Sequence, residues 1–221
     1  MTSTQEIRNR LRASQVPFLS NDNIADHLEA GDITVMRAEV EDSVRQLLDV
    51  LLIDWRSDHN TDDTPRRVAK LLVDEVFAGR YQPQPPVTTF PNIHEAQGIV
   101  TVGPIDVRSA CSHHLVPILG RAWVGIVPGE RLIGLSKFSR LIQWIMTRPQ
   151  IQEEAIEQVA DLLEFHTKPK GLAVVIKANH LCCQWRGVKD HSVMTSSVMR
   201  GVFFDDSRAR LEFLKLIEDR T

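Results

Sequence analysis

The sequence predicts an α+β protein, in which a helical N-terminal part precedes a segment of paired strands and paired helices. Apolar residues recur at spacings of three and four from residue 35 to residue 77. After a connector with four prolines, at residues 81–91, the pattern changes to strand-like alternation. The elements then follow in the order β-β-α-α-β-β-α, which favours an antiparallel sheet with helices on one face.

The N-terminal part is predicted to hold a polar arm and then two helices. Residues 1–33 are polar, are interrupted by Pro17 and show no sustained period, so they are interpreted as a polar N-terminal arm. Residues 34–92 are predicted to form a helical segment with its connector. The second helix is expected to start with Thr64 as N-cap and Pro65 at the first helical position, and to stop at Gly79.

Residues 93–221 are predicted to form the second domain, and their pattern indicates four strands and three helices. Strands are expected at residues 99–107, 115–127, 171–182 and 192–204. Helices are expected at residues 136–146, 151–165 and near 207–218.

Composition and charge argue against several classes of protein. The chain is 43% hydrophobic and 25% charged, which is typical of a globular domain. Its longest apolar runs fall far short of the roughly 20 residues that span a bilayer, and the N-terminus lacks the pattern of a secretory signal. No membrane association and a cytoplasmic location are therefore expected. The net charge of −3 argues against nucleic-acid binding but is compatible with a local basic pocket for a small anion.

The three cysteines all stand near histidines. They occur in two short motifs, Cys111-Ser112-His113-His114 and His180-Leu181-Cys182-Cys183. Three cysteines do not make a disulfide framework, and thiols grouped with imidazoles indicate metal binding or catalysis. The alternative is that the cysteines are buried and inert, since free cysteines often behave as small hydrophobic residues.

Spacing indicates which of these residues could share a metal ion. On a strand over residues 171–182, His180 and Cys182 point to one face and Cys183 to the other, so Cys182 is the better candidate ligand. Cys111 and His114 are three positions apart, so the chain must turn between them if both bind. A Cys, His, Cys set suits zinc and leaves a fourth position for water, as in catalytic sites. No Cys-x-x-Cys or His-x₃-His pair accompanies Cys111-x-x-His114, which argues against a zinc ribbon or finger. The zinc-deaminase signature is also absent from the sequence.

Four motifs, in order and at matching spacing, resemble the GTP cyclohydrolase I family. They are Cys111–Pro117, Gly134–Arg140, Arg148–Glu153 and the run His180-x-Cys182-x-x-x-Arg186-Gly187-Val188. The resemblance extends from about residue 35 to residue 217 and includes the helix that begins Thr64-Pro65-x-Arg67. It implies a tunnelling fold, in which β-β-α-α-β-β units of several subunits join into a barrel. It also implies a homodecamer of two stacked pentamers, with active sites at the subunit interfaces.

The resemblance further implies a reaction. This is the zinc-dependent hydrolytic opening of the guanine imidazole ring of GTP, with release of formate and formation of dihydroneopterin triphosphate. Carried over to this sequence, Cys111, His114 and Cys182 would bind Zn²⁺. His113 and His180 would be the catalytic proton-transfer residues, a role that suits the titration range of histidine.

The remaining implied residues would bind the substrate. Glu153, aided by Gln152, would hold the guanine edge, because a carboxylate can accept hydrogen bonds from both N1–H and the exocyclic amine. The residues expected at the triphosphate are basic or hydroxylic: Ser136, Lys137, Arg140, Arg186 and Arg67. From the pattern alone, Lys137 and Arg140 could also form a solvated helix face, and Glu153 could simply complement the helix dipole.

Two other functions stay open. Position 112 is usually acidic in this family but is Ser112 here, and Cys183, Gln184 and Trp185 also differ from the commoner residues. A divergent relative could act on another purine or stop at the ring-opened formamide. A non-catalytic, zinc-stabilised assembly is the third hypothesis. It is disfavoured because such a protein has no physical need for the two histidines, Glu153 and the basic set.

Overall fold

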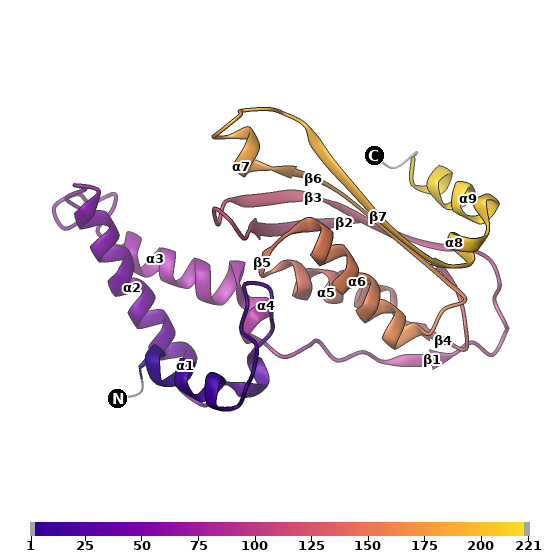
Figure 1. Cartoon of the computed structure of the whole chain (residues 1–221), viewed down its shortest axis with the longest axis horizontal. Coiled ribbons are helices and arrows are strands. Elements are labelled where there is room, and N and C mark those ends of the chain that lie inside the picture. Colours follow the sequence, from indigo (N-terminus) through magenta and orange to yellow (C-terminus); the bar gives the residue numbers. More distant parts are fainter. Residues whose placement is uncertain (1–2, 219–221) are drawn as a thin grey trace. The chain divides into compact units, whose positions relative to one another are not determined.

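The computed structural model describes residues 3–218, and the chain divides into two compact units, Met1–Pro83 and Gln84–Thr221. The first unit is helical, whereas the second is built around a five-stranded sheet (Figure 1). None of the helices among the described residues is both long and apolar enough to span a membrane.

The helices of the first unit begin inside the segment that was interpreted as a polar arm. They are α1 (Thr4–Ala13), the 3₁₀ turn η1 (Ala25–His27), α2 (Asp32–Val50), α3 (Thr64–Lys70), the π-helical segment η2 (Leu71–Val76) and α4 (Ala78–Tyr81). Helix α1 starts with a reciprocal capping box, in which the Ser3 hydroxyl accepts from the backbone of Glu6 and the Glu6 carboxylate accepts from the backbone of Ser3. Its apolar residues Ile7 and Leu11 are buried with Ile24.

The predicted second helix has different ends. Asp63, not Thr64, stands at the N-cap position, so Thr64 is the first helical residue and Pro65 is the second instead of the first. Gly79 does not end the helical path, which continues through η2 and α4 to Tyr81. Gly79 is buried there, and its carbonyl accepts a hydrogen bond from the Asn23 amide. Gly79 therefore lies inside the short buried helix α4 instead of at a free helix end.

The second unit contains the predicted β-β-α-α-β-β arrangement. Its main sheet has the order β5-β2-β3-β6-β7, with β5 (Pro149–Gln150), β2 (Val100–Cys111), β3 (Pro117–Val127), β6 (Gly171–His180) and β7 (Val193–Gly201). The four long strands are antiparallel to their neighbours, and β5 pairs parallel with β2. A small second sheet joins β1 (Thr89–Pro91) to β4 (Arg131–Ile133). The α+β class and the tunnelling-fold unit are therefore confirmed.

Helices cover the two faces of this sheet unequally. Both α5 (Leu135–Met146) and α6 (Gln152–Thr167) pack on one face, where Ile142 and Leu163 meet Val174 in the main core (Figure 1). Two C-terminal helices, α8 (Val202–Asp205) and α9 (Ser207–Glu218), pack on the other face, where Phe213 meets Trp123. The predicted helices on one face are confirmed for α5 and α6, and the closing helix adds a smaller core behind the sheet.

Two predicted strands end earlier than expected. Strand β6 ends at His180, which pairs with Ile118, and the next residue of the neighbouring strand is Pro117, where β3 begins. For Leu181, β3 therefore offers only a proline, which has no backbone N–H, and the chain turns into the short helix α7 (Leu181–Gln184). Strand β7 ends at Gly201, whose φ of 55° redirects the chain into α8. The prediction that Cys182 lies on a strand is thus wrong.

Gly120 provides a test of how tightly the sheet is built. A Cβ atom at this position would lie 2.2 Å from the carbonyl oxygen of Lys177 and 2.5 Å from the Cβ of Ala178. We expect Gly120→Ala to lower the free energy of unfolding by about 1–3 kcal/mol, because the backbone of β6 must move. The matched control is Gly98→Ala, where an added methyl would meet no atom within 4 Å. Urea denaturation measures both variants, and equal midpoints would contradict the close packing at Gly120.

Candidate metal centre

Three side chains that can bind a metal converge at one end of the sheet. The ligand atoms of Cys111, His114 and Cys182 all lie within 4.8 Å of one another. Cys111 is the last residue of β2, His114 lies in the turn that follows, and Cys182 lies in α7 directly after β6. Strand β3 pairs with both β2 and β6, so the register of the sheet brings the C-terminal ends of these two strands together.

The turn after β2 brings Cys111 and His114 to the same place. The Leu115 N–H donates to the Cys111 carbonyl over 2.8 Å, and the Cys111 N–H donates to the Val116 carbonyl over 2.9 Å. Leu115 adopts a positive φ of 54°, which reverses the chain before β3. The turn that was expected if both residues bind is therefore present.

Of the two adjacent cysteines, Cys182 belongs to the group and Cys183 does not. Cys182 is buried and Cys183 is exposed, with their sulfur atoms 4.0 Å apart. Strand alternation was the wrong reason for preferring Cys182, because both residues lie in α7. The helical turn separates the two side chains instead, and the Trp185 N–H closes it by donating to the Leu181 carbonyl over 2.9 Å.

The chemistry of this donor set fits a thiophilic divalent metal. Burial raises the pKa of the Cys182 thiol to about 12, and the hydrogen bond with the Cys111 thiol adds to the rise. A buried thiol with a raised pKa resists ionisation unless a cation compensates its charge, and a coordinating thiol is deprotonated outright. Two sulfurs and one imidazole match the ligand types of zinc sites.

His180 is the last residue of β6, two positions before Cys182, and its ring is held by Gln152. Its Nε2 lies 2.8 Å from Oε1 of Gln152, which is 1% exposed. The Gln152 amide nitrogen donates to the Ile176 carbonyl over 3.1 Å and to the Ser196 hydroxyl over 2.9 Å. Burial lowers the pKa of His180, while the negative charge of Glu153 acts in the opposite direction.

The other predicted histidine and one predicted arginine lie on the exposed side of the group. Nδ1 of His113 lies 3.9 Å from Sγ of Cys111. A guanidinium nitrogen of Arg186 lies 2.7 Å from Nε2 of His114. An anion that binds beside the metal ligands would therefore meet the positive charge of Arg186.

The remaining predicted residues are spread over three helices. Glu153 is exposed in the first turn of α6, next to the buried Gln152. Ser136, Lys137 and Arg140 belong to the first turns of α5, and the Lys137 ammonium donates to the Pro86 carbonyl over 2.7 Å. Arg67 belongs to α3 of the first unit, where its Nε lies 3.1 Å from a carboxylate oxygen of Asp63.

Sequence reasoning missed Ser196, whose hydroxyl helps to fix Gln152. Ser196 lies on β7, opposite Ile176 on β6, and both residues bond to the same amide. The only signal that could have found it is the pairing of β6 with β7, which a single sequence does not contain.

Comparison with known proteins adds the family. A solved structure, the apo form of an archaeosine synthase QueF-Like protein, aligns with a TM-score of 0.39 and 11% identity over 48% of this chain and 94% of that one. GTP cyclohydrolase 1 of Haemophilus ducreyi is 39% identical over 183 residues, which are 82% of this chain and 84% of that protein. The protein of the same name from Pasteurella multocida is 38% identical over 190 residues, which are 84% of this chain and 86% of that protein. The family model described as GTP cyclohydrolase I matches residues 40–218. The chain therefore belongs to the GTP cyclohydrolase I family of enzymes.

Proposed function

We propose that this chain catalyses the zinc-dependent hydrolytic opening of the guanine imidazole ring of GTP, releasing formate and forming dihydroneopterin triphosphate. The observation that carries the proposal is the convergence of Cys111, His114 and Cys182 beside His180, in a chain that belongs to this family. The Haemophilus and Pasteurella relatives both carry the name GTP cyclohydrolase 1.

Cys111, His114 and Cys182 would hold the zinc ion. Both thiols are buried, so the chain shields the metal on that side, while His114 is exposed and faces the solvent. When bound there, zinc supplies Lewis acidity at neutral pH. Among the described residues 3–218 the group offers three protein ligands, a composition that suits a catalytic centre better than a closed structural one.

His180 and His113 would move protons to and from the purine. Because the Gln152 amide nitrogen donates to Ile176 and Ser196, its oxygen must face His180 and accept from Nε2–H. The bond fixes the tautomer of His180 and leaves Nδ1 as the nitrogen that can accept a proton. The exposed His113, whose Nδ1 lies 3.9 Å from Sγ of Cys111, can serve as a second proton carrier.

Glu153 would select guanine, with Gln152 assisting. The carboxylate of Glu153 is exposed and close enough to His180 for its charge to oppose the lowering of the His180 pKa by burial, so it can reach a ligand bound beside His180. Both polar atoms of the Gln152 amide already make hydrogen bonds. A direct contact of Gln152 with guanine would require one of these hydrogen bonds to break. Its hydrogen bond to His180 is already formed and needs no rearrangement.

Replacing Glu153 tests this role. We expect Glu153→Gln to lower kcat/KM for GTP by about 10- to 100-fold, because a hydrogen bond from the ligand to a charged acceptor becomes one to a neutral amide. Zinc content should stay at the wild-type level. The matched control is Glu154→Gln, which makes the same change one residue away and should leave kcat/KM within about twofold of wild type. Unchanged turnover of GTP by Glu153→Gln would refute the role.

The triphosphate would bind to a set of basic and hydroxylic side chains. Arg186 supports this assignment best, because its guanidinium lies at His114 and can bind phosphate oxygens in a bidentate manner. The other members of the proposed set are Ser136, Lys137, Arg140 and Arg67. The proposal includes a cytoplasmic homodecamer with active sites at subunit interfaces, a catalytic domain at residues 93–221, and the segments 1–33 and 34–92 before it.

The decisive experiment is the incubation of purified, zinc-loaded protein with GTP. Formate release and pterin fluorescence after oxidation should appear together, since only the complete reaction closes the pterin ring. Formate or a ring-opened product without pterin would identify an enzyme that stops early. Absence of both products from zinc-loaded protein would overturn the proposed substrate.

A further inference from the structure

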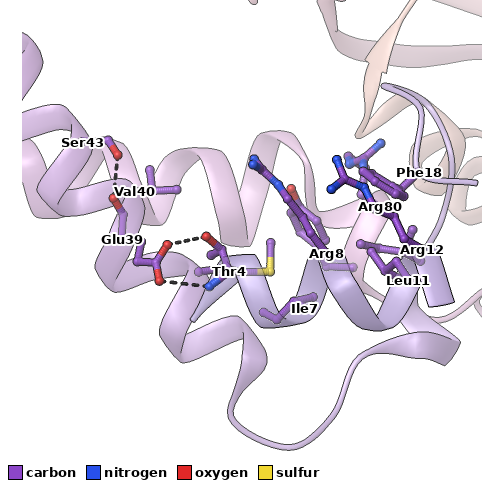
Figure 2. Close-up of a pocket in the computed structure, with 13 residues that line it drawn as sticks. Thr4, Ile7, Arg8, Leu11, Arg12, Phe18, Glu39, Val40, Ser43 and Arg80 are labelled. Carbon is purple, nitrogen blue, oxygen red and sulfur yellow. Dashed lines mark hydrogen bonds between the residues drawn. The ribbon is translucent and has the colours of Figure 1, made fainter. Parts of the chain in front are cut away.

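We propose that the first unit contains a separate binding site for an amphipathic organic anion, a molecule with an aromatic or alicyclic body and one acidic group. The site is a pocket of about 510 Å³ between α1, α2 and the segments around Phe18 and Tyr81 (Figure 2). This volume lies within the range of about 300–1,000 Å³ that is typical of small-molecule sites. All residues that line it belong to Met1–Pro83, and none is a proposed active-site residue.

The inner surface of the pocket is apolar. Ile7 and Leu11 come from one face of α1 and are buried with Ile24. Met36 packs against this small cluster, and Val40 lines the pocket one turn further along α2. An aliphatic surface of this kind favours the hydrocarbon or ring part of a ligand over water.

Aromatic side chains extend the apolar surface at one end. Phe18 and Tyr81 are half-buried, line the pocket and pack against the same cluster. Figure 2 shows Phe18 close to Arg12 and Arg80 at this end, while Glu39 and Thr4 lie at the opposite end with Arg8 between them. A flat ligand would find ring faces and guanidinium groups together here.

The charge of the pocket is positive. Arg8, Arg12 and Arg80 line it against a single carboxylate, Glu39, which leaves a net charge of +2. Both oxygens of Glu39 accept hydrogen bonds from Thr4, one from its hydroxyl and one from its backbone N–H. These bonds lower the pKa of Glu39, which therefore stays ionised but has its oxygens occupied.

Two of the three arginines are available to a ligand. The Arg80 guanidinium donates to the carbonyls of Leu19 and Ser20 and so holds the wall of the pocket. Within the described residues 3–218, the side chains of Arg8 and Arg12 make no hydrogen bond or ion pair. They stand four residues apart on α1, where like charges repel each other. The charge of Arg8 also acts on Glu39, whose pKa it helps to lower, but one carboxylate cannot balance three guanidinium groups. A bound anion would reduce the remaining repulsion, so the pocket combines an apolar surface with an excess of positive charge.

A pair of fluorescent dyes tests both parts of this proposal on the full-length chain. Anilinonaphthalene sulfonate has an aromatic body and one anionic group, whereas phenylnaphthylamine has the same kind of body without the charge. We expect the double variant Arg8→Gln/Arg12→Gln to bind the sulfonate about five- to tenfold more weakly, with the affinity for the neutral dye unchanged. The control Arg208→Gln removes an exposed arginine of the second unit that makes no side-chain bond within the described residues. It should not change either affinity.

A second variant tests the apolar part without touching the charges. Val40→Trp should fill the pocket and abolish the binding of both dyes, whereas Gln46→Trp places the same side chain at an exposed position of α2 outside the lining and should abolish neither. Far-UV circular dichroism confirms that each variant is folded. Wild-type sulfonate affinity in Arg8→Gln/Arg12→Gln, or retention of both dyes by Val40→Trp, would overturn the proposal. Loss of sulfonate binding in Arg186→Gln would also overturn it, because the dye would then occupy the proposed active site.

Discussion

Cys182→Ser is expected to lose bound zinc and GTP turnover together. Cys182 supplies one of the two buried sulfurs of the metal group, and a serine hydroxyl does not ionise to replace a thiolate. With one sulfur and one imidazole left, we expect zinc after gel filtration to fall below about a tenth of the wild-type content. Plasma mass spectrometry measures the metal, and formate release measures the turnover.

Cys183→Ser is the matched control, because it makes the same chemical change one residue away. Cys183 is exposed, and its sulfur lies 4.0 Å from that of Cys182 but outside the group. Zinc content and turnover should stay within about twofold of wild type. Equal loss of zinc in both variants would show that the metal uses the two adjacent thiols, and the assignment of Cys111, His114 and Cys182 would fall.

The order of the elements was predictable because their apolar periods are strong. Helices α5, α6 and α9 lie within one or two residues of their predicted ends. The end of β6 was not predictable, because it depends on where β3 begins, at Pro117, more than fifty positions earlier in the chain. Helix α1 was missed since its surroundings are polar, although the Ser3-x-x-Glu6 capping box was a usable signal.

The metal group was predictable from residue types and the family resemblance, but its geometry was not. Spacing left open whether Cys111 and His114 could meet, and the turn closed by Leu115 answers that question. The reason given for preferring Cys182 failed, because alternation applies only while the chain remains a strand. The contact of His180 with Gln152 joins α6 to the end of β6, and no local pattern in the sequence reports such a contact.

His180→Ala is expected to lower kcat for GTP by about 100- to 10,000-fold, the range that general acid–base catalysis contributes. The ring is half-buried at the end of β6 and oriented by Gln152, so alanine leaves nothing in its place that can carry a proton. Zinc content should remain at the wild-type level, because His180 is not a member of the metal group. Single-turnover measurements of formate release, with metal analysis of the same sample, separate the two effects.

A second variant keeps His180 but removes the hydrogen bond that orients its ring. Gln152→Leu preserves the approximate volume of a buried side chain, and it removes the acceptor at 2.8 Å that fixes the tautomer of His180. If His180 acts by proton transfer, Gln152→Leu should lower kcat by less than His180→Ala, and the double variant should be no worse than His180→Ala alone. The exposed His191 provides the control. His191→Ala removes an imidazole from the segment between α7 and β7 and should leave kcat unchanged. Additive losses in the double variant would mean that Gln152 acts on the substrate directly, and wild-type kcat in His180→Ala would refute the catalytic role of His180.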